Sequence, residues 1–342
     1  MKRKSRADGE SVDLLQKAEQ TSLAGNVDEA ILLYRKALDF AGKQDHAVKA
    51  KAMRSLGNLW WRKGKPRKAL DYFNRSLAIS KSARDLSGVA QAYNCIGTVY
   101  FDSGKWPTVE RYFTRALNAA ERSGDLKLTA HLYNNLGAMW NIRGYGDRAI
   151  SFYRKAEQIY RKLKDKRGLA RIHNNLGLTY RDRSDWKEAA KHYQECARLS
   201  KECADRSLWA NCTLNYVQVL IELSNYAKAR ERCDEAFEVL IRMGEVAGIA
   251  EAMMLNGMIY TRKGKLAIAE KQFAESVMIN ENQGNLLGKA ECYKEMALMY
   301  KIWGNRSRTL EYLDKAYRVF KTLKAKKYLR EIENQVAALG AV

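Results

Sequence analysis

The sequence predicts an all-α fold, a right-handed α-solenoid superhelix of about eight helical hairpins closed by one further helix. The first observation is a series of seven alanines, each 40 residues after the last: Ala50, Ala90, Ala130, Ala170, Ala210, Ala250 and Ala290. The second is a position seven residues after each alanine, here called the glycine slot, which holds Gly57, Gly97, Gly137, Gly177, Val217, Gly257 and Ala297. A fixed period of this kind indicates a stacked array, because each unit buries its apolar face against the next.

Residues 165–200 show how one unit is built. Asp165 is the expected N-cap, since its carboxylate can accept from the free amides of a first helical turn. Apolar residues then advance by three and four positions at Leu169, Ile172, Leu176 and Tyr180. Ser184 and Asp185 interrupt this stripe, and a second one follows at Trp186, Ala189, Ala190, Tyr193 and Ala197. Neither helix can bury its stripe alone, so the unit is a hairpin that needs neighbours.

The other units repeat this design. An acidic or amide residue opens each one, at Asp45, Asp85, Asp125, Asp165, Asp205, Glu245 and Asn285. An aromatic ring follows the slot by three residues, at Trp60, Tyr100, Trp140, Tyr180, Tyr260 and Tyr300, with Leu220 as the exception. A turn is expected seven residues after the slot, at Gly64, Gly104, Gly144, Ser184, Ser224, Gly264 and Gly304. The second helix then carries a small residue and a ring four positions later, as at Ala149 and Tyr153, which suits close helix packing.

The same register sets the expected boundaries. The first unit is anchored by Ala18, Gly25, Ala30 and Tyr34, and the last by Ala297, Tyr300 and Gly304. Beyond it, residues 323–339 form one more amphipathic stretch, in which Arg330 takes the alanine position and no second helix follows. We therefore expect a basic N-terminal tail at 1–10, a solenoid at 11–320 and a capping helix at 321–342.

These residues resemble a known family. The pattern L-G-x-x-Y/W, a turn glycine and A-x-x-x-F/Y is similar to the tetratricopeptide repeat, with a clear example in Leu136, Gly137, Trp140, Gly144, Ala149 and Tyr153. The usual unit has about 34 residues, so this is a variant with longer helices, similar to the repeats of kinesin light chains, Pins-type adaptors and Rap-type peptide sensors. The resemblance covers nearly the whole chain. It implies an interaction scaffold whose first helices line a concave groove.

Composition narrows the function classes. Lys and Arg number 61 against 39 Asp and Glu, a formal net charge of +22, which concerns partners and solubility rather than fold. No secretion signal or apolar run of membrane-spanning length is found, so we expect a cytoplasmic protein. The six cysteines form no C-x-x-C pair, and we expect free thiols that pack as small apolar groups in a reducing compartment.

No catalytic, metal or cofactor site is expected. The four histidines, His46, His131, His173 and His192, are scattered, and no H-E-x-x-H motif occurs. Residues 144–146, Gly-Tyr-Gly, superficially suggest a nucleotide loop, but they fall on a hairpin turn with no strand before them. We therefore predict a non-enzymatic protein.

The resemblance implies that the residues facing the groove lie six before, three before, one after and four after the glycine slot. In the second to fifth units we predict partner-binding residues at Lys51, Arg54, Asn58, Trp61, Asn94, Phe101, His131, Asn134, Asn141, Arg171, Asn174 and Arg181. Toward the C-terminus these positions become apolar, and the predicted set continues with Leu214, Ile221, Met254 and Met258. Exposed methionine and leucine would suit an apolar helix of a partner or self-association.

The asparagines of the first helices have two readings. Asn94, Asn134 and Asn174 lie three before the slot and Asn135, Asn175 and Asn215 two before, although asparagine is a mediocre helix former. They either form an amide ladder that holds the backbone of an extended peptide, or they bond between adjacent helices and fix the stacking. Arg54 with Asn58 also looks like half of the carboxylate clamp of co-chaperone repeats. Cys95 and Ala138 replace parts of the other half, which argues against binding of chaperone tails.

Three partner classes remain open. The leading hypothesis is a protein-interaction scaffold that grips a peptide or partner segment, acidic because the chain is basic. The alternatives are a basic nucleic-acid-binding solenoid, for which weak non-specific affinity is expected, and a peptide-sensing regulatory module. No membrane insertion is expected.

Overall fold

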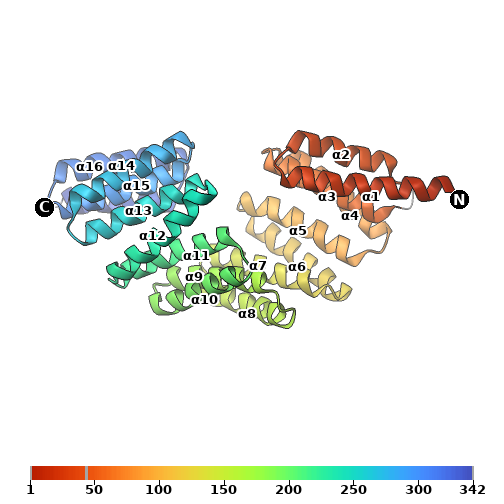
Figure 1. Cartoon of the computed structure of the whole chain (residues 1–342), viewed down its shortest axis with the longest axis horizontal. Helices are drawn as coiled ribbons and strands as arrows, with labels where there is room; N and C mark the ends of the chain where they lie inside the picture. Colours follow the sequence, from red (N-terminus) through yellow and green to blue (C-terminus); the bar gives the residue numbers. More distant parts are fainter. Residues whose placement is uncertain (1, 43–44, 341–342) are drawn as a thin grey trace. The chain divides into compact units, whose positions relative to one another are not determined.

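The computed structural model describes residues 2–42 and 45–340, which fold into seventeen α-helices and no strand (Figure 1). They form two compact units, residues 1–165 and 166–342. Unit 1 holds α1 (Lys2–Leu23), α2 (Val27–Phe40), α3 (His46–Arg62), α4 (Pro66–Ser82), α5 (Leu86–Asp102), α6 (Trp106–Ser123), α7 (Leu126–Ile142) and α8 (Gly146–Lys162). Unit 2 holds α9 (Lys166–Asp182), α10 (Trp186–Glu202), α11 (Arg206–Glu222), α12 (Tyr226–Met243), α13 (Val246–Arg262), α14 (Leu266–Asn282), α15 (Leu286–Ile302), α16 (Arg306–Thr322) and α17 (Lys326–Gly340). The predicted all-α repeat solenoid is confirmed.

Turns and caps define each hairpin. The seven predicted turn residues all have positive φ, from 56° at Ser224 to 83° at Gly144. A second left-handed series precedes the next first helix, at Arg84, Gly124, Lys164, Ala204, Gly244, Gly284 and Lys324. The sequence does not reveal this second series because its side chains differ. Some of the opening carboxylates cap their helices: Asp125 accepts from the Leu128 amide at 3.0 Å and Asp205 from the Leu208 amide at 3.1 Å. Asp45 and Glu245 stand at the N-cap position without such a bond.

The glycine slot is a contact between the two helices of a hairpin. A Cβ at Gly137 would lie 2.5 Å from the ring of Tyr153, and one at Gly257 would lie 2.6 Å from the ring of Phe273. Where the slot is not glycine, the ring position changes too: Cys233 stands opposite Val217, and Leu313 opposite Ala297. Val217 and Cys233 are both fully buried in one core. The hairpin accommodates Val217 because cysteine, which is smaller than a ring, makes room for it.

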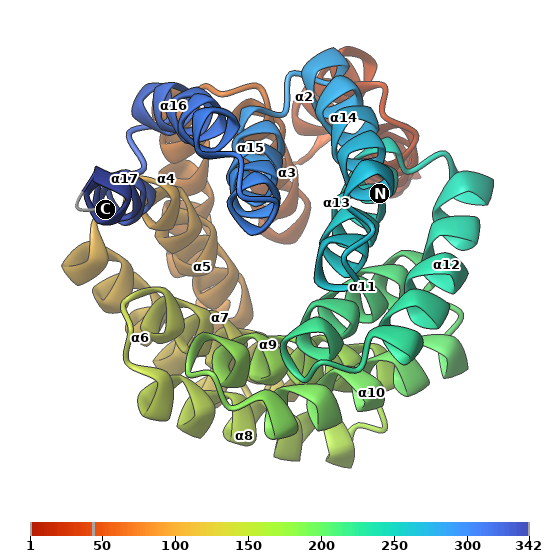
Figure 2. The ribbon, with the colours of Figure 1, turned by 90° about the vertical axis from the view of Figure 1, so that its left-hand side faces the viewer.

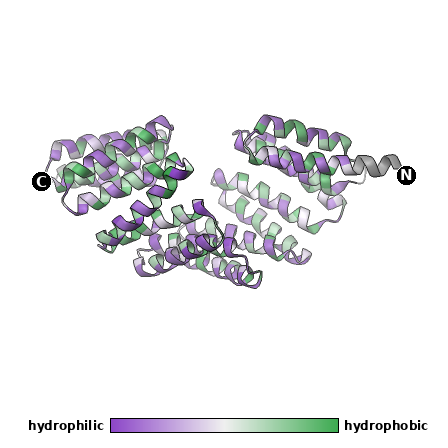
Figure 3. Ribbon diagram, in the orientation of Figure 1, coloured by the Kyte–Doolittle hydropathy of each residue, from purple (hydrophilic) through white to green (hydrophobic). Residues whose placement is uncertain are grey.

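The first helices of successive hairpins also touch each other. In unit 1, α3 contacts α5 and α5 contacts α7, and in unit 2 the series runs through α9, α11, α13 and α15. Figure 2 shows α9, α11 and α13 on one side of unit 2 and α10 and α12 on the other. Successive first helices touch one another, whereas successive second helices of the described residues do not. The first helices therefore line the inner face of each unit. Figure 3 shows hydrophobic and hydrophilic residues alternating around the helices, as packing on one side requires.

The two ends of the chain differ from expectation in one respect. Residues 2–10 are not a separate tail, because they form the start of α1. At the other end, α17 packs on α16 and buries Ile332, while Arg330 is exposed at the alanine position. Among the described residues, no helix has both the length and the apolar character needed to cross a membrane.

Two cysteines also depart from expectation. Cys196 of α10 and Cys212 of α11 are joined in a disulfide, with their Cα atoms 6.1 Å apart, and both are fully buried. The packing of the two helices brings these thiols together although neither lies in a C-x-x-C motif. Cys95, Cys203, Cys233 and Cys292 are free, as predicted for all six.

Candidate functional site on the inner face of unit 2

A pocket of about 630 Å³ lies along the first helices of unit 2. Its walls come from α9, α11, α13, α15 and α17, with Leu240 of α12 and Ser276 and Asn280 of α14 between them. The side chains that line it include Arg181, Asn211, Gln218, Glu251, Met254, Met258, Glu291, Lys294, Glu295 and Tyr328.

The lining follows the predicted register. Arg181 lies four after a glycine slot, Gln218 and Met258 one after, and Met254 and Lys294 three before. The position six before contributes Asn211, Glu251 and Glu291. Sequence reasoning missed these three residues, although the count that gives Lys51 and Arg171 also gives them.

Three carboxylates of the pocket are destabilised in their charged form. Glu251 is exposed and Glu291 is half-buried, and both line the concave pocket, where the surrounding protein displaces part of the water near their carboxylates. This burial raises the pKa of Glu251, and the charge of Glu291 raises it further. Burial also raises the pKa of Glu291 and of Glu295, with Lys294 opposing the shift in both cases.

The two cations of the pocket already have partners. Arg181 donates to the Gln218 side-chain oxygen at 2.8 Å and lies 3.5 Å from Asp182. Lys294 donates to Glu331 at 3.3 Å. Burial lowers the pKa of Lys294, but Glu295 and Glu331 outweigh it, so the net pKa is raised. The pocket therefore has more carboxylates than cations, and both cations are hydrogen-bonded to other residues.

The predicted apolar residues of unit 2 divide into two groups. Met254 and Met258 line the pocket, beside Leu255. Leu214 and Ile221 do not, because they are only 0% and 2% exposed and pack in the core of the unit. The prediction that these two residues are exposed on the groove is wrong: α11 is buried on most of its circumference, and apolar side chains at inner positions turn into the core.

The predicted residues of unit 1 lie on its inner face but are engaged with neighbours. Lys51 pairs with Glu19 at 2.6 Å, and Arg54 donates to Ser76 at 3.3 Å. The Trp61 indole donates to Asp102 at 2.9 Å, and Phe101 packs edge-on against the ring of Trp106. Asn58 is exposed. The contacts of Lys51 and Trp61 join neighbouring hairpins, whereas those of Arg54 and Phe101 lie within one hairpin.

The asparagines bond between adjacent first helices. The Asn135 amide donates to the Asn94 side-chain oxygen at 2.8 Å, joining α7 to α5. In unit 2 the Asn215 amide donates to Asn174 at 3.2 Å, joining α11 to α9. The stacking reading of Asn94 and Asn174 therefore has direct support.

The remaining predicted residues lie outside the pocket. His131 and Arg171 are exposed, while Asn134 and Asn141 are half-buried. The His131 ring nitrogen lies 3.3 Å from the Asn135 amide.

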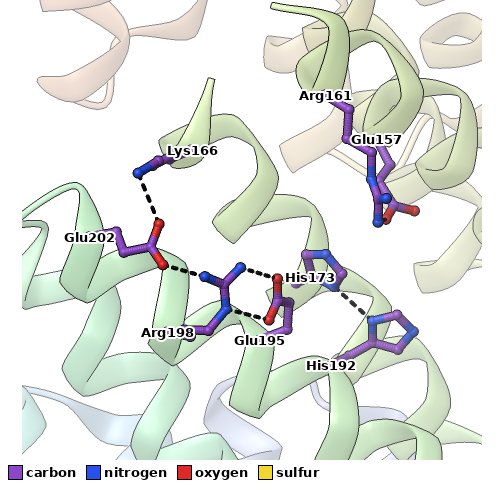
Figure 4. A network of polar contacts seen from close by, with 8 residues as sticks. All are labelled: Glu157, Arg161, Lys166, His173, His192, Glu195, Arg198 and Glu202. Atoms are coloured by element: carbon purple, nitrogen blue, oxygen red, sulfur yellow. Dashed lines mark hydrogen bonds and ion pairs between the residues drawn. The ribbon is translucent and has the colours of Figure 1, made fainter. Parts of the chain in front are cut away.

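Figure 4 shows two further polar clusters of unit 2. His173 and His192, which look unrelated in the sequence, meet with their Nδ1 atoms 2.9 Å apart, and both rings are buried. On the surface, Arg198 donates to Glu195 and Glu202, and Lys166 pairs with Glu202 at 2.9 Å. The figure also draws Glu157 and Arg161 of unit 1, an ion pair of 2.6 Å within α8. In the described part of the chain, no three His, Cys, Asp or Glu side chains gather closely enough to hold a metal ion.

Comparison with known proteins identifies the repeats. The family model of the tetratricopeptide repeat matches residues 11–82 and 132–202. These two segments therefore match tetratricopeptide repeats, and the hairpins outside them keep the same 40-residue register, with Val217 and Ala297 in place of glycine at two slots. A search of curated proteins finds no similar sequence.

Solved structures share the fold at low sequence identity. The apo form of RapI is 15% identical with a TM-score of 0.68, covering 81% of this chain and 99% of its own. The apo form of the quorum sensor NprR from B. thuringiensis is 17% identical with a TM-score of 0.69, covering 91% and 87%. A Rap protein complexed with Competence and Sporulation Factor is 13% identical with a TM-score of 0.65, covering 98% of each chain. The chain therefore has a Rap-like repeat architecture.

Proposed function

We propose that this protein is a non-enzymatic scaffold that binds a peptide or partner segment on the inner faces of its first helices. The observation that carries the proposal is the pocket of unit 2, because residues from five helices line it at inner positions of the repeat. A pocket of this size with apolar and polar walls suits a short segment of chain better than a flat surface does.

The architecture adds support. Two of the similar structures are described as a quorum sensor and as a complex with Competence and Sporulation Factor, so this arrangement of helices is used elsewhere to recognise signals. We extend that use to this chain as a proposal only at the level of peptide or protein binding.

We further propose that the partner is acidic over most of its length. The net charge of +22 steers an acidic partner toward the chain and disfavours a basic one. On unit 1, Lys51, Arg54 and Asn58 offer cations and an amide on the inner face, with Trp61 beside them. This long-range attraction should weaken as salt screens it.

A display selection tests the proposal. A library of randomised short peptides is selected on the full chain, beside a variant in which Asn211→Trp fills the pocket. Asn211 is exposed on the inner face, so the larger ring does not enter the core. Arg242→Trp, at an exposed position of α12, is the matched control.

Enrichment of peptides by the wild type and by Arg242→Trp, with loss in Asn211→Trp, is the expected result. Binding of the enriched peptides should also weaken between low and physiological salt if the partner is acidic. Equal enrichment by all three proteins would contradict binding in the pocket.

A further inference from the structure

We infer that the pocket of unit 2 takes one cationic side chain of the bound segment, a lysine ammonium or an arginine guanidinium, against Glu251 and Glu291. The inference rests on the proposed function and names the chemistry of its anchor. It concerns one local contact, whereas the acidic character proposed above concerns the partner as a whole.

The charges around the pocket are the first reason. Glu251, Glu291 and Glu295 belong to two adjacent first helices, and Glu291 is close enough to Glu251 to disfavour its ionisation. Arg181 lowers the pKa of both carboxylates and Lys294 lowers that of Glu291, but both pKa values stay raised. The hydrogen bonds of the two cations go to Gln218 and Glu331 instead. A cation placed between Glu251 and Glu291 would offset a repulsion that the unliganded protein carries.

The shape of the lining is the second reason. Met254 lies three residues after Glu251 and Met258 seven residues after it, on the same face of α13. The pocket therefore places thioethers beside carboxylates. Lysine and arginine have this same division into an apolar stem and a charged head, and methionine adapts readily to a flexible stem.

The corresponding positions of unit 1 provide an internal reference. Six residues before the slot, α13 and α15 carry Glu251 and Glu291, whereas α3, α5 and α7 carry Lys51, Gln91 and His131. The helical hairpin does not require a carboxylate there. The presence of a carboxylate at this position in two successive hairpins that line one pocket is consistent with a role in binding.

Enriched peptides from the display selection provide the probe. A peptide enriched on the wild type is synthesised with an acetylated N-terminus, so that no terminal amine supplies the charge. Its lysine or arginine is then replaced by norleucine, which keeps the stem and removes the cation. Both peptides are titrated against the wild type, Glu251→Gln, Glu291→Gln and the double variant.

The wild type should bind the cationic peptide about tenfold or more tightly than the norleucine peptide, since a hydrogen bond to a charged group is worth about 1.5–3 kcal/mol. The double variant should bind the two peptides equally, and each single variant should fall between. Glu238→Gln, an exposed position of α12 outside the pocket, should behave as the wild type. Glutamine keeps the size of glutamate and removes a charge that burial disfavours, so thermal unfolding should show all variants folded.

The outcomes separate this inference from the proposed function. Enriched peptides that lack lysine and arginine, or equal binding of the norleucine peptide by the wild type, would overturn the cationic anchor and leave peptide binding intact. Retention of the full preference by the double variant would overturn the assignment to Glu251 and Glu291. Failure to enrich any peptide would overturn both.

Discussion

The first helices of unit 1 and the last first helices of unit 2, α13 and α15, use the same helical position for different chemistry. At the position six before the glycine slot, unit 1 places Lys51, Gln91 and His131, and the last hairpins of unit 2 place Glu251 and Glu291. In unit 1, Lys51 forms an ion pair with Glu19 and remains partly open to solvent. In unit 2 the carboxylates border an open pocket.

This difference shows which positions the fold constrains. The slot and the ring opposite it are constrained because a Cβ at the slot would overlap the ring, as at Gly137 and Gly257. The inner positions carry no such contact, so their charge is free to serve a partner. A net charge of +22 therefore describes long-range attraction and does not describe the chemistry of an individual pocket.

The largest expected effect tests whether hairpins of both units depend on the same contact between the glycine slot and the ring. Gly137→Val in unit 1 and Gly257→Val in unit 2 should each destabilise the protein by about 1–3 kcal/mol or more, since the new side chain overlaps a buried ring. Thermal and urea unfolding of each variant measure the loss.

The natural pair Val217 and Cys233 supplies the control for that experiment. Adding Tyr153→Cys to Gly137→Val should recover part of the stability, because it reproduces the combination that α11 and α12 already use. If the valine variants were as stable as the wild type, the slot would not be the constraint that both units share.

The next effect concerns the asparagine contacts. Asn135→Ala in unit 1 and Asn215→Ala in unit 2 should each cost about 0.5–1.5 kcal/mol, because each removes one hydrogen bond between first helices. A double-mutant cycle with Asn94→Ala or Asn174→Ala should give a coupling of similar size in both units. Loss of peptide binding without any coupling would instead indicate that these asparagines contact the bound peptide.

A smaller effect is expected on the pH dependence of stability, because the carboxylates with raised pKa values lie in unit 2. The raised pKa values of Glu251, Glu291 and Glu295 mean that the folded chain binds more protons than the unfolded chain. This contribution to stability is complete below the ordinary glutamate pKa and is lost as pH rises through the raised values. The wild type should therefore gain stability relative to the double Glu→Gln variant as pH falls from neutral into the carboxyl range.

Unfolding by urea at a series of pH values measures that gain. Charged groups that face these carboxylates, among them Lys294, Arg181, Arg262 and Glu331, remain in both proteins, so the difference isolates the two substituted side chains. Identical pH profiles for the two proteins would contradict the raised pKa values.

The smallest effect is expected on the outer surface. Arg198→Ala removes the contacts to Glu195 and Glu202 on α10, both open to solvent. Exposed pairs contribute little, and salt screens them. Stability and peptide binding should stay near the wild-type values at physiological salt, and a large loss would show that this cluster supports more than its own helix.

The sequence determined the fold more completely than the site. Period, slot and ring predict every hairpin because they record contacts between neighbouring helices, and Gly177 with Tyr193 is one such pair. The register also predicts Arg181, Met254 and Met258 in the pocket. It fails at Leu214 and Ile221, since position on a helix does not show how much of α11 the neighbours cover. The Cys196–Cys212 bond and the His173–His192 contact depend on packing between helices, which no local pattern records.

The carboxylate character of the pocket in unit 2 is tested most directly by inverting the charge of Glu251 and Glu291. The affinities of a lysine-bearing peptide and its glutamate-bearing counterpart are measured on the wild type and on the double variant E251K/E291K. The wild type should favour the lysine peptide, and the variant should favour the glutamate peptide. The same preference in both proteins would contradict a carboxylate-lined site in unit 2.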